Sequence, residues 1–202
     1  MTGHQEFPGL VVWCTGLSSS GKTTICAAVH ERLAARGLSV VMLDGDEIRQ
    51  NISNDLGFSK ADRDENIRRI GFYAWLLSRA GVVVLVSAIS PYRAARRQVR
   101  TKIERFVEVY INAPLVVCER RDRKGIYGMA RRGDMHNVTG IDDPYEPPEE
   151  PELECRTDLE TVEESVAKVL AAISPALDAI PDFLPRYASP RENEASPKKT
   201  TY

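Results

Sequence analysis

The chain has 202 residues, of which 43% are hydrophobic and 28% charged, a composition typical of one globular domain with a sizeable core. Its formal net charge of −2 excludes a general attraction to nucleic acid or to an anionic membrane. We therefore expect neither as a partner, and any anion site must be local. The longest apolar run, at 82–88, is too short to cross a bilayer and suits a buried strand.

Apolar segments predict four strands along the chain, and segments of helical composition separate them. The strands are expected at 10–15, 38–43, 82–89 and 106–112. After the first strand, apolar residues recur at four-residue spacing, and Gly37 offers a helix stop. Ser59 followed by Asp62 resembles a capping box that opens a helix to about Ala80, with Gly81 closing it. This alternation predicts an α/β fold with a parallel sheet and helices on both faces.

The last third of the chain has a different pattern. From 122 to 152, charges, glycines and prolines replace the apolar period, and a loop of this length is usually functional or disordered. A helix is expected again at 159–173. Beyond Pro175 the sequence is polar and rich in proline. We therefore expect a single domain over 1–175 and a disordered polar tail over 176–202.

A glycine-rich motif follows the first expected strand. It has the Walker A pattern G-x-x-x-x-G-K-[ST], in which glycines let backbone N–H groups close around phosphate oxygens. Lys22 would reach the β- and γ-phosphates, and Thr23 would ligate Mg²⁺. Because the motif follows a strand and opens a helix, we interpret it as a P-loop. The predicted nucleotide-binding residues are Gly16, Leu17, Ser18, Ser19, Ser20, Gly21, Lys22, Thr23 and Thr24.

A P-loop occurs in switches and motors as well as in kinases. A GTPase would need the guanine-reading tetrapeptide N-K-x-D, which this sequence lacks. A motor would need a second, coupling domain, for which a chain of 202 residues has little room. A small kinase is therefore the leading class.

Two carboxylates follow the second expected strand. Ligands bind outside the carboxyl ends of parallel strands, so Asp44 and Asp46 would face the P-loop. One can hold Mg²⁺ and the other can take a hydroxyl proton, which suits phosphoryl transfer. The alternative is a polar turn in which Asp44 caps the next helix.

Basic residues and one aromatic residue come next in the chain. Arg49 and Arg63 suit an anionic acceptor, since the guanidinium fork matches phosphate or sulfate oxygens, and Asn66 follows them in the chain. Phe58 offers a ring to a base, and Ser90, at the end of the third strand, offers a hydroxyl. The alternatives are a solvated helix face, above all for Arg68 and Arg69, and a helix cap for Ser90.

Six stretches of the sequence are similar to those of one protein family and occur in the same order: GLSSSGKTT, DGDEIR, DLGFSKADRDENIRRIG, ISPYRAAR, DRKGIYGMARRG and TGIDDPYEPPEEPE. They resemble the adenylylsulfate kinases, and the resemblance covers about 12–170. It implies a three-layer sandwich of the P-loop kinase type, with a central parallel sheet and a mobile lid at about 122–152. It also implies transfer of the γ-phosphate of MgATP to the 3′-hydroxyl of adenosine 5′-phosphosulfate (APS).

The resemblance also implies roles for individual residues. Asp46 would act at the 3′-hydroxyl with Asp44 nearer the metal, and Lys22 would serve both catalysis and ATP binding. Ser90 is sometimes a phosphoserine in such enzymes, but we expect direct in-line transfer, since P-loop catalysis needs little covalent chemistry. The substrate-binding residues would be Asp46, Arg49, Phe58, Arg63, Asn66, Ile89, Ser90, Lys124 and Val138. In the lid, Arg131 or Arg132 would neutralise the transferring phosphoryl group.

The resemblance further implies a homodimer. A cytoplasmic location is expected because the four cysteines lie far apart without CxxC spacing, as small core residues in a reducing compartment do.

Four positions depart from the usual family pattern. Val138 stands where a phenylalanine commonly offers a second ring to the substrate adenine, and His136 stands where a lysine is frequent. Gly128 and Met129 replace a lysine pair, and Ala95 replaces an acid. These changes leave two alternatives to an adenylylsulfate kinase. One is a kinase of the same fold acting on another nucleotide-like anion, and the other is a non-catalytic nucleotide-binding module.

Overall fold

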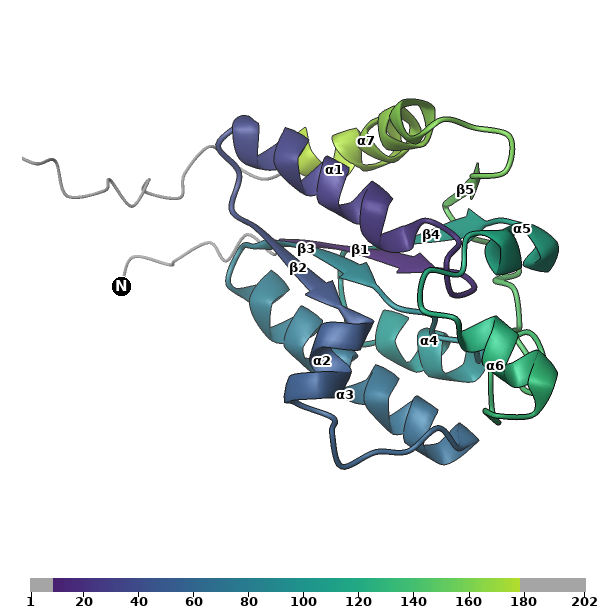
Figure 1. Ribbon diagram of the computed structural model, residues 1–202. Coiled ribbons are helices and arrows are strands. Elements are labelled where there is room, and N and C mark those ends of the chain that lie inside the picture. The colour runs from purple at the N-terminus through teal and green to yellow at the C-terminus, as the bar shows by residue number, and fades with distance from the viewer. Residues whose placement is uncertain (1–8, 179–202) are drawn as a thin grey trace, which may run out of the picture.

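A computed structural model describes residues 9–178, and its fold is built on one five-stranded sheet (Figure 1). The strands are β1 (Leu10–Thr15), β2 (Val40–Asp44), β3 (Val83–Ser87), β4 (Phe106–Asn112) and β5 (Leu153–Arg156). They run parallel in the order β2-β3-β1-β4-β5. The predicted parallel sheet is confirmed, and its central strand, β1, leads directly into the P-loop.

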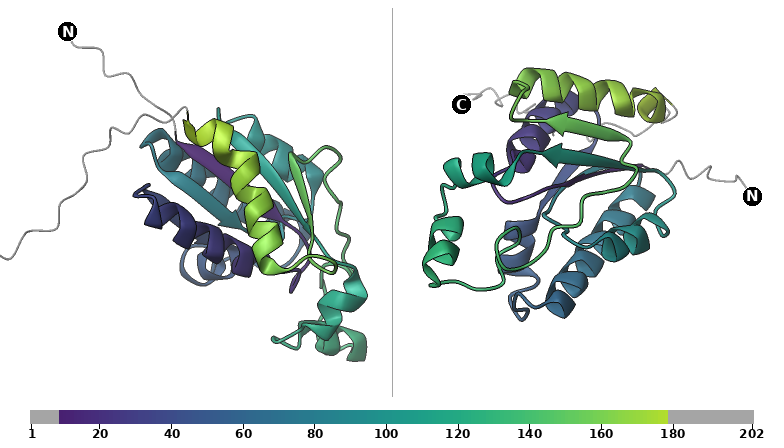
Figure 2. Two further views of the ribbon diagram at one scale, coloured as in Figure 1. Left: turned by 90° about the horizontal axis from the view of Figure 1, so that it is seen from above. Right: turned by 90° about the vertical axis from the view of Figure 1, so that its right-hand side faces the viewer.

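Helices cover both faces of the sheet, as Figures 1 and 2 show. They are α1 (Lys22–Ala35), α2 (Gly45–Asn51), α3 (Lys60–Arg79), α4 (Arg93–Arg100), α5 (Leu115–Arg120), α6 (Ile126–Arg132) and α7 (Val162–Asp178). Helices α1 and α7 pack together on one face, and α3 and α4 pack together on the other. The predicted three-layer α/β sandwich is confirmed.

The central strand shows how the sequence specifies these layers. All six residues of β1 are buried, and successive side chains point to opposite faces of the sheet. Val12 and Cys14 join the apolar core beneath α1 and α7, whereas Val11 and Trp13 join the core beneath α3 and α4. An uninterrupted apolar run is what a parallel strand covered on both faces requires.

Both ends of α3 follow local signals. The Ser59 hydroxyl accepts a hydrogen bond from the Asp62 N–H at 3.2 Å and so caps the helix. Gly81 follows the other end with a φ of 80°, a conformation that glycine adopts at little cost. The predicted cap and glycine stop are confirmed. The four cysteines are free and buried, as expected of small core residues. Across residues 9–178, none of the helices has the length and apolarity needed to span a bilayer.

Three features of the last third differ from the prediction. The pattern does not predict β5, because this strand has only four residues and forms by pairing with β4. The stretch at 122–152 contains the short helix α6. The last helix begins at Val162 and continues past Pro175 to Asp178, because Leu177 is buried in the core beneath it. Residues 176–178 are therefore helical, and the rest of the predicted tail lies outside the described residues.

Candidate functional site

The P-loop backbone depends on two glycines. Gly16 has a φ of 154°, and a Cβ there would lie only 2.2 Å from the Ile111 carbonyl oxygen. Gly21, with a φ of 107°, precedes the first residue of α1. The motif therefore needs glycine at both positions for steric reasons. The loop places the N-terminus of α1, with its unpaired N–H groups, at the carboxyl end of the sheet, which favours phosphate there.

Lys22 is buried at the start of α1. Its ammonium donates to the carbonyl oxygens of Leu17 at 2.7 Å and Gly16 at 3.1 Å. Burial lowers the pKa of Lys22 to about 8, although nearby Asp46 and Asp44 favour its charged form. The P-loop thus holds a partly desolvated cation, and a triphosphate would favour its charged form further.

Three oxygen-bearing side chains meet between the P-loop and the sheet. The Thr23 hydroxyl donates to Asp44 Oδ2 at 2.9 Å and lies 3.0 Å from Ser87 Oγ. The other carboxylate oxygen of Asp44 accepts from the Asp46 N–H at 2.9 Å and caps α2. Asp44 therefore does cap α2, as the alternative predicts, but only one of its two oxygens is used for the cap, and the other contacts Thr23.

This oxygen cluster fits a magnesium ion. Across residues 9–178, no group of three or more His, Cys, Asp or Glu side chains could hold a metal ion. Mg²⁺ is usually held by one or two protein oxygens, with phosphate oxygens and water completing its octahedron. Thr23 and Asp44 are hard oxygen ligands of the kind this ion requires.

Asp46 lies in the first turn of α2 with its side chain exposed to solvent. Its carboxylate forms an ion pair with Lys124, from the predicted lid. The two residues are far apart in the chain, so the fold brings together two of the predicted acceptor residues. The carboxylate is accessible to a hydroxyl group placed beside the P-loop.

Phe58 is the centre of a basic cluster. The residue is 53% exposed, and the guanidinium carbons of Arg49 and Arg63 lie 4.7 and 5.6 Å from its ring centroid. Arg63 also donates to the Phe58 carbonyl at 3.0 Å and to the carbonyl of Asn137 in the lid. Nearby, the buried Asn66 Oδ1 has no hydrogen-bond partner.

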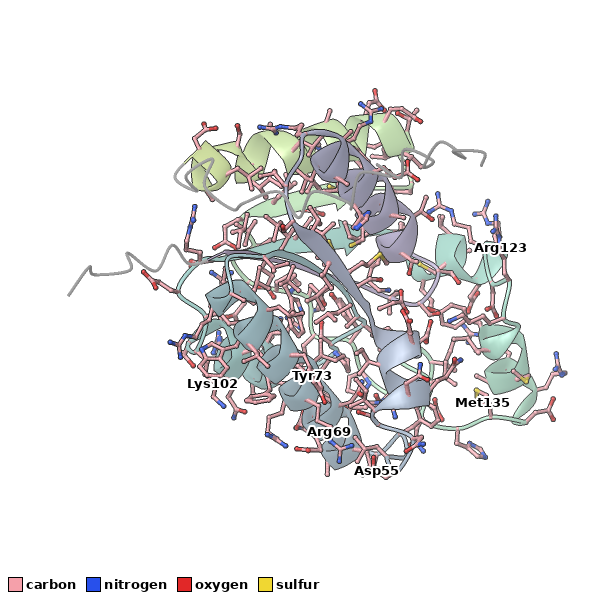
Figure 3. The ribbon with its side chains drawn as sticks, turned by 90° about the vertical axis from the view of Figure 1, so that its left-hand side faces the viewer. Asp55, Arg69, Tyr73, Lys102, Arg123 and Met135 are labelled. Carbon is pink, nitrogen blue, oxygen red and sulfur yellow. The ribbon has the colours of Figure 1, made fainter. Side chains whose placement is uncertain are left out.

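Arg68 and Arg69 take no part in this cluster. Arg69, on α3, makes bonds of 2.6 and 2.8 Å to both oxygens of Asp55 in the loop before that helix, and Figure 3 shows these two residues close together. Arg68 pairs with Glu65 on the same helix. The alternative of a solvated helix face describes Arg68, whose side chain is 58% exposed, whereas Arg69 is only 25% exposed and its pair with Asp55 fastens the loop that carries Phe58.

Ser90 is buried, and its hydroxyl is occupied within the protein. It accepts from Trp13 Nε1 at 3.0 Å and donates to Thr15 Oγ1 at 2.9 Å. Its φ of 41° lies in the left-handed region. Because Thr15 directly precedes the P-loop, Ser90 joins the end of β3 to the base of that loop.

The predicted lid packs on a small apolar cluster. Tyr127 is buried at its centre, and its hydroxyl donates to the Ser18 carbonyl in the P-loop at 3.1 Å. Val138 packs in the same cluster and is only 6% exposed. Arg131 pairs with Glu119 at 2.7 Å on the outer side. Figure 3 shows Arg123 and Met135 near the ends of α5 and α6, in this part of the molecule.

One cavity of about 1280 Å³ joins these parts. Most of the predicted residues line it, whereas Gly16, Leu17, Ser20 and Arg131 do not. Sequence reasoning missed several lining residues: Ser87, Arg120, Arg121 and Thr157. Thr157 donates to the Ser20 carbonyl at 2.7 Å. The run of cationic residues at 120–124 could have indicated Arg120 and Arg121. Nothing in the local sequence distinguishes Thr157.

A P-loop, an adjacent carboxylate pair and a second, basic pocket within one cavity define a small P-loop kinase. The family model described as adenylylsulphate kinase matches residues 8–156. An adenylyl-sulfate kinase of Synechococcus sp. (strain JA-3-3Ab) is 62% identical over 141 residues, which are 70% of this chain and 80% of that protein. The chain therefore belongs to the adenylylsulphate kinase family.

Solved structures agree with this assignment. The Mycobacterium tuberculosis APS kinase CysC, in complex with AMPPNP and APS, is 42% identical with a TM-score of 0.80, covering 83% of this chain and 98% of its own. A hexameric APS kinase from Thiobacillus denitrificans is 35% identical with a TM-score of 0.64. That match covers 87% of this chain but 30% of the other. The fold and the family thus agree.

Proposed function

We propose that the protein transfers the γ-phosphate of ATP to the 3′-hydroxyl of APS, giving 3′-phosphoadenosine 5′-phosphosulfate. The observation that carries this proposal is the single cavity of about 1280 Å³, in which the P-loop and the basic pocket around Phe58 meet at Asp46. A nucleoside triphosphate and a second nucleotide can thus share one cavity. Family membership supports the same reaction.

The donor end of the cavity holds ATP. Backbone N–H groups of the P-loop and the Lys22 ammonium bind the phosphates, while Thr23 and Asp44 hold Mg²⁺. When bound, the ion offsets the negative charge that develops on the β- and γ-phosphate oxygens. Arg120 and Arg121 line this cavity, whereas Arg131 faces Glu119, so we assign the remaining charge neutralisation to the former pair.

The acceptor end holds APS. The exposed ring of Phe58 stacks with the adenine, while Arg49 and Arg63 bind the phosphosulfate. Asn66 supports a polar contact, because its buried Oδ1 has no partner within the protein and can accept from a ribose hydroxyl. Lys124 moves from Asp46 to the anion as the substrate enters. Ile89 and Val138 form the apolar walls.

The chemical step is a direct displacement. Asp46 accepts the proton of the 3′-hydroxyl as its oxygen bonds to the γ-phosphorus, and the bond from that phosphorus to the β,γ-bridging oxygen breaks to release ADP. Ser90 supports the pocket wall in this scheme, because its buried hydroxyl is held by Trp13 and Thr15. The lid excludes water, so that the phosphoryl group meets the substrate hydroxyl.

The active form in this proposal is a homodimer in the cytoplasm, a reducing compartment that suits four free cysteines. Phe72 and Leu76, one turn apart on α3, are 52% and 50% exposed and offer a self-complementary apolar contact. Light scattering during size-exclusion chromatography tests it. We expect a dimer that Leu76→Glu converts to a monomer, whereas a monomeric wild-type protein would contradict it.

The reaction is tested by incubating the purified protein with MgATP labelled at the γ-phosphate and with APS. We expect the label at the 3′-position of the nucleotide product, resolved by chromatography. Val138, which packs in the lid cluster at 6% exposure instead of offering a ring, favours one alternative: a kinase of the same fold with another nucleotide acceptor. Label on another added nucleotide, with none on APS, would support that alternative.

A further inference from the structure

One buried cation has no part in the mechanism above. Arg96 lies on α4 and is only 3% exposed. Its guanidinium donates to Glu108 on β4 at 2.7 Å, to the Ser90 carbonyl at 2.6 Å and to the Glu146 carbonyl at 2.8 Å. A single planar group therefore joins three segments that are far apart in the chain. The following inference rests on the proposed function.

The first of these segments is a wall of the acceptor pocket. Ser90 and Pro91 line the cavity, and Ser90 has a φ of 41°. A residue other than glycine keeps such a conformation only when its surroundings enforce it. The Ser90 hydroxyl is held by Trp13 and its carbonyl by Arg96. The wall is thus fixed from both sides.

The second segment is the strap, defined here as residues 143–152, which follows the lid. The Glu146 N–H donates to the Pro91 carbonyl at 2.8 Å, and the Glu146 carboxylate accepts from the Arg93 N–H at 2.8 Å. That carboxylate supplies the cap that Tyr92, at the start of α4, does not provide. The strap and the acceptor wall therefore form one hydrogen-bonded unit.

Further contacts fasten the strap along α4 and to the acceptor arginine. Arg100 binds both oxygens of Glu152 at 2.6 and 2.7 Å. At the other end, Asp143 accepts from the Tyr92 hydroxyl at 2.8 Å and lies 3.3 Å from Arg63 Nε. These contacts hold the strap against the body of the protein, so the part of the predicted lid that can move ends before Asp143.

We infer that Arg96 is a positioning residue for the acceptor half of the reaction: it locks the wall at Ser90 and Pro91 to the strap and so sets the shape of the APS pocket. Lysine cannot replace it, because an ammonium on a flexible stem does not reproduce three donors in one plane. Arg96 hydrogen-bonds to Glu108, Ser90 and Glu146, and its guanidinium carbon lies 6.0 Å from the centroid of the Tyr145 ring, so none of these partners belongs to the P-loop at 16–24. Substitution of Arg96 should therefore change the KM for APS and leave the KM for ATP unchanged.

The test is the variant Arg96→Lys, with steady-state constants measured for both substrates. We expect the KM for APS to rise on the order of tenfold while the KM for ATP stays within about twofold, since small misplacements of a substrate are costly. The matched control is Arg97→Lys, whose side chain is 68% exposed and pairs with Glu149 on the same strap. It should leave both constants unchanged.

A merely structural role for Arg96 would lower the melting temperature and the active fraction but change neither KM, and that result would overturn the inference. If Arg96→Lys does not fold, Glu146→Ala takes its place, because it keeps Arg96 paired and removes only the cap of α4. We expect it to raise the KM for APS several-fold and not the KM for ATP. Wild-type protein that fails to phosphorylate APS would contradict the proposed function itself, whereas an active wild type with unchanged variant constants would overturn only the role of Arg96.

Discussion

The two ends of the cavity are constructed differently. The phosphate-binding part of the donor end comes from one continuous segment, in which β1, the P-loop and α1 follow one another over 10–35, and Asp44, Arg120 and Arg121 only complete it. The acceptor end is assembled from distant segments: Asp46 pairs with Lys124, and Arg63 binds the carbonyl of Asn137. A phosphate-binding site can thus be formed by residues that are neighbours in the sequence. Selection of the acceptor depends instead on contacts between distant residues, which only the complete fold provides.

The largest expected effect comes from the carboxylate between the two ends. Asp46→Asn removes the proton acceptor and should lower kcat by about 10²–10⁴-fold while ATP binding stays nearly unchanged. Rapid-quench kinetics and calorimetric ATP titration measure the two quantities. The control is Glu47→Gln, since Glu47 is the exposed neighbour and does not line the cavity. Loss of ATP binding in Asp46→Asn would show that this residue belongs to the donor end.

The next effect concerns the acceptor end alone. Phe58→Ala removes the exposed ring, and base stacking on an aromatic side chain contributes ~1–3 kcal/mol. We expect the KM for APS to rise by roughly ten- to a hundredfold, with the KM for ATP as the internal reference. An equal rise in both constants would mean that Phe58 supports the cavity as a whole instead of binding the substrate base.

The donor end should respond to pH through Lys22. Because burial lowers its pKa to about 8, Lys22 loses its charge above this pH in the free protein, and ATP binding must then include proton uptake. We expect the Kd for ATP to weaken about tenfold at pH 9 relative to the plateau at lower pH. Calorimetry in two buffers of different ionisation enthalpy measures the uptake. An affinity that is constant from pH 7 to 9 would contradict this account.

The same pKa has a consequence for stability. The folded-state pKa of Lys22 lies below its ordinary value of 10.5, so the buried charge destabilises the fold at neutral pH. This contribution should raise the free energy of unfolding as pH increases from about 8 to 10.5.

The smallest expected effects come from removing two tyrosine hydroxyls, one at the donor end of the cavity and one at the acceptor end. Tyr127 binds the Ser18 carbonyl in the P-loop at 3.1 Å, and Tyr92 binds Asp143 in the strap at 2.8 Å. Each hydrogen bond contributes about 0.5–1.5 kcal/mol. Tyr127→Phe should raise the KM for ATP a few-fold, and Tyr92→Phe should do the same for APS. If both variants raised the same constant, the two ends would not be separable.

The features that the sequence predicts are those that depend on neighbouring residues, and the features it does not predict depend on distant partners. Buried apolar runs specify β1 and β4 residue for residue, and the Walker pattern locates the P-loop, because these features depend on neighbours in the chain. β5 and Thr157 could not be predicted, since each is defined by its partner: β4 for the strand and the Ser20 carbonyl for the hydroxyl. Asp44 was ambiguous for a physical reason, as its two oxygens serve a helix cap and Thr23 separately.

Family resemblance predicts further site residues that the local sequence does not, but it does not predict which side chains those residues contact. It predicts that Lys124 lies in the acceptor pocket, where it pairs with Asp46. It also predicts Arg131 at the ATP, whereas that side chain pairs with Glu119 and does not line the cavity.

A competition for the phosphoryl group tests which nucleotide is the acceptor. Purified protein is given MgATP labelled at the γ-phosphate with equal concentrations of APS and adenosine 5′-phosphate, and the nucleotides are resolved by chromatography. We expect label almost entirely on the 3′-phosphorylated product of APS, because Arg49 and Arg63 select the phosphosulfate. Preferential labelling of adenosine 5′-phosphate, or bound ATP without any labelled acceptor, would contradict it.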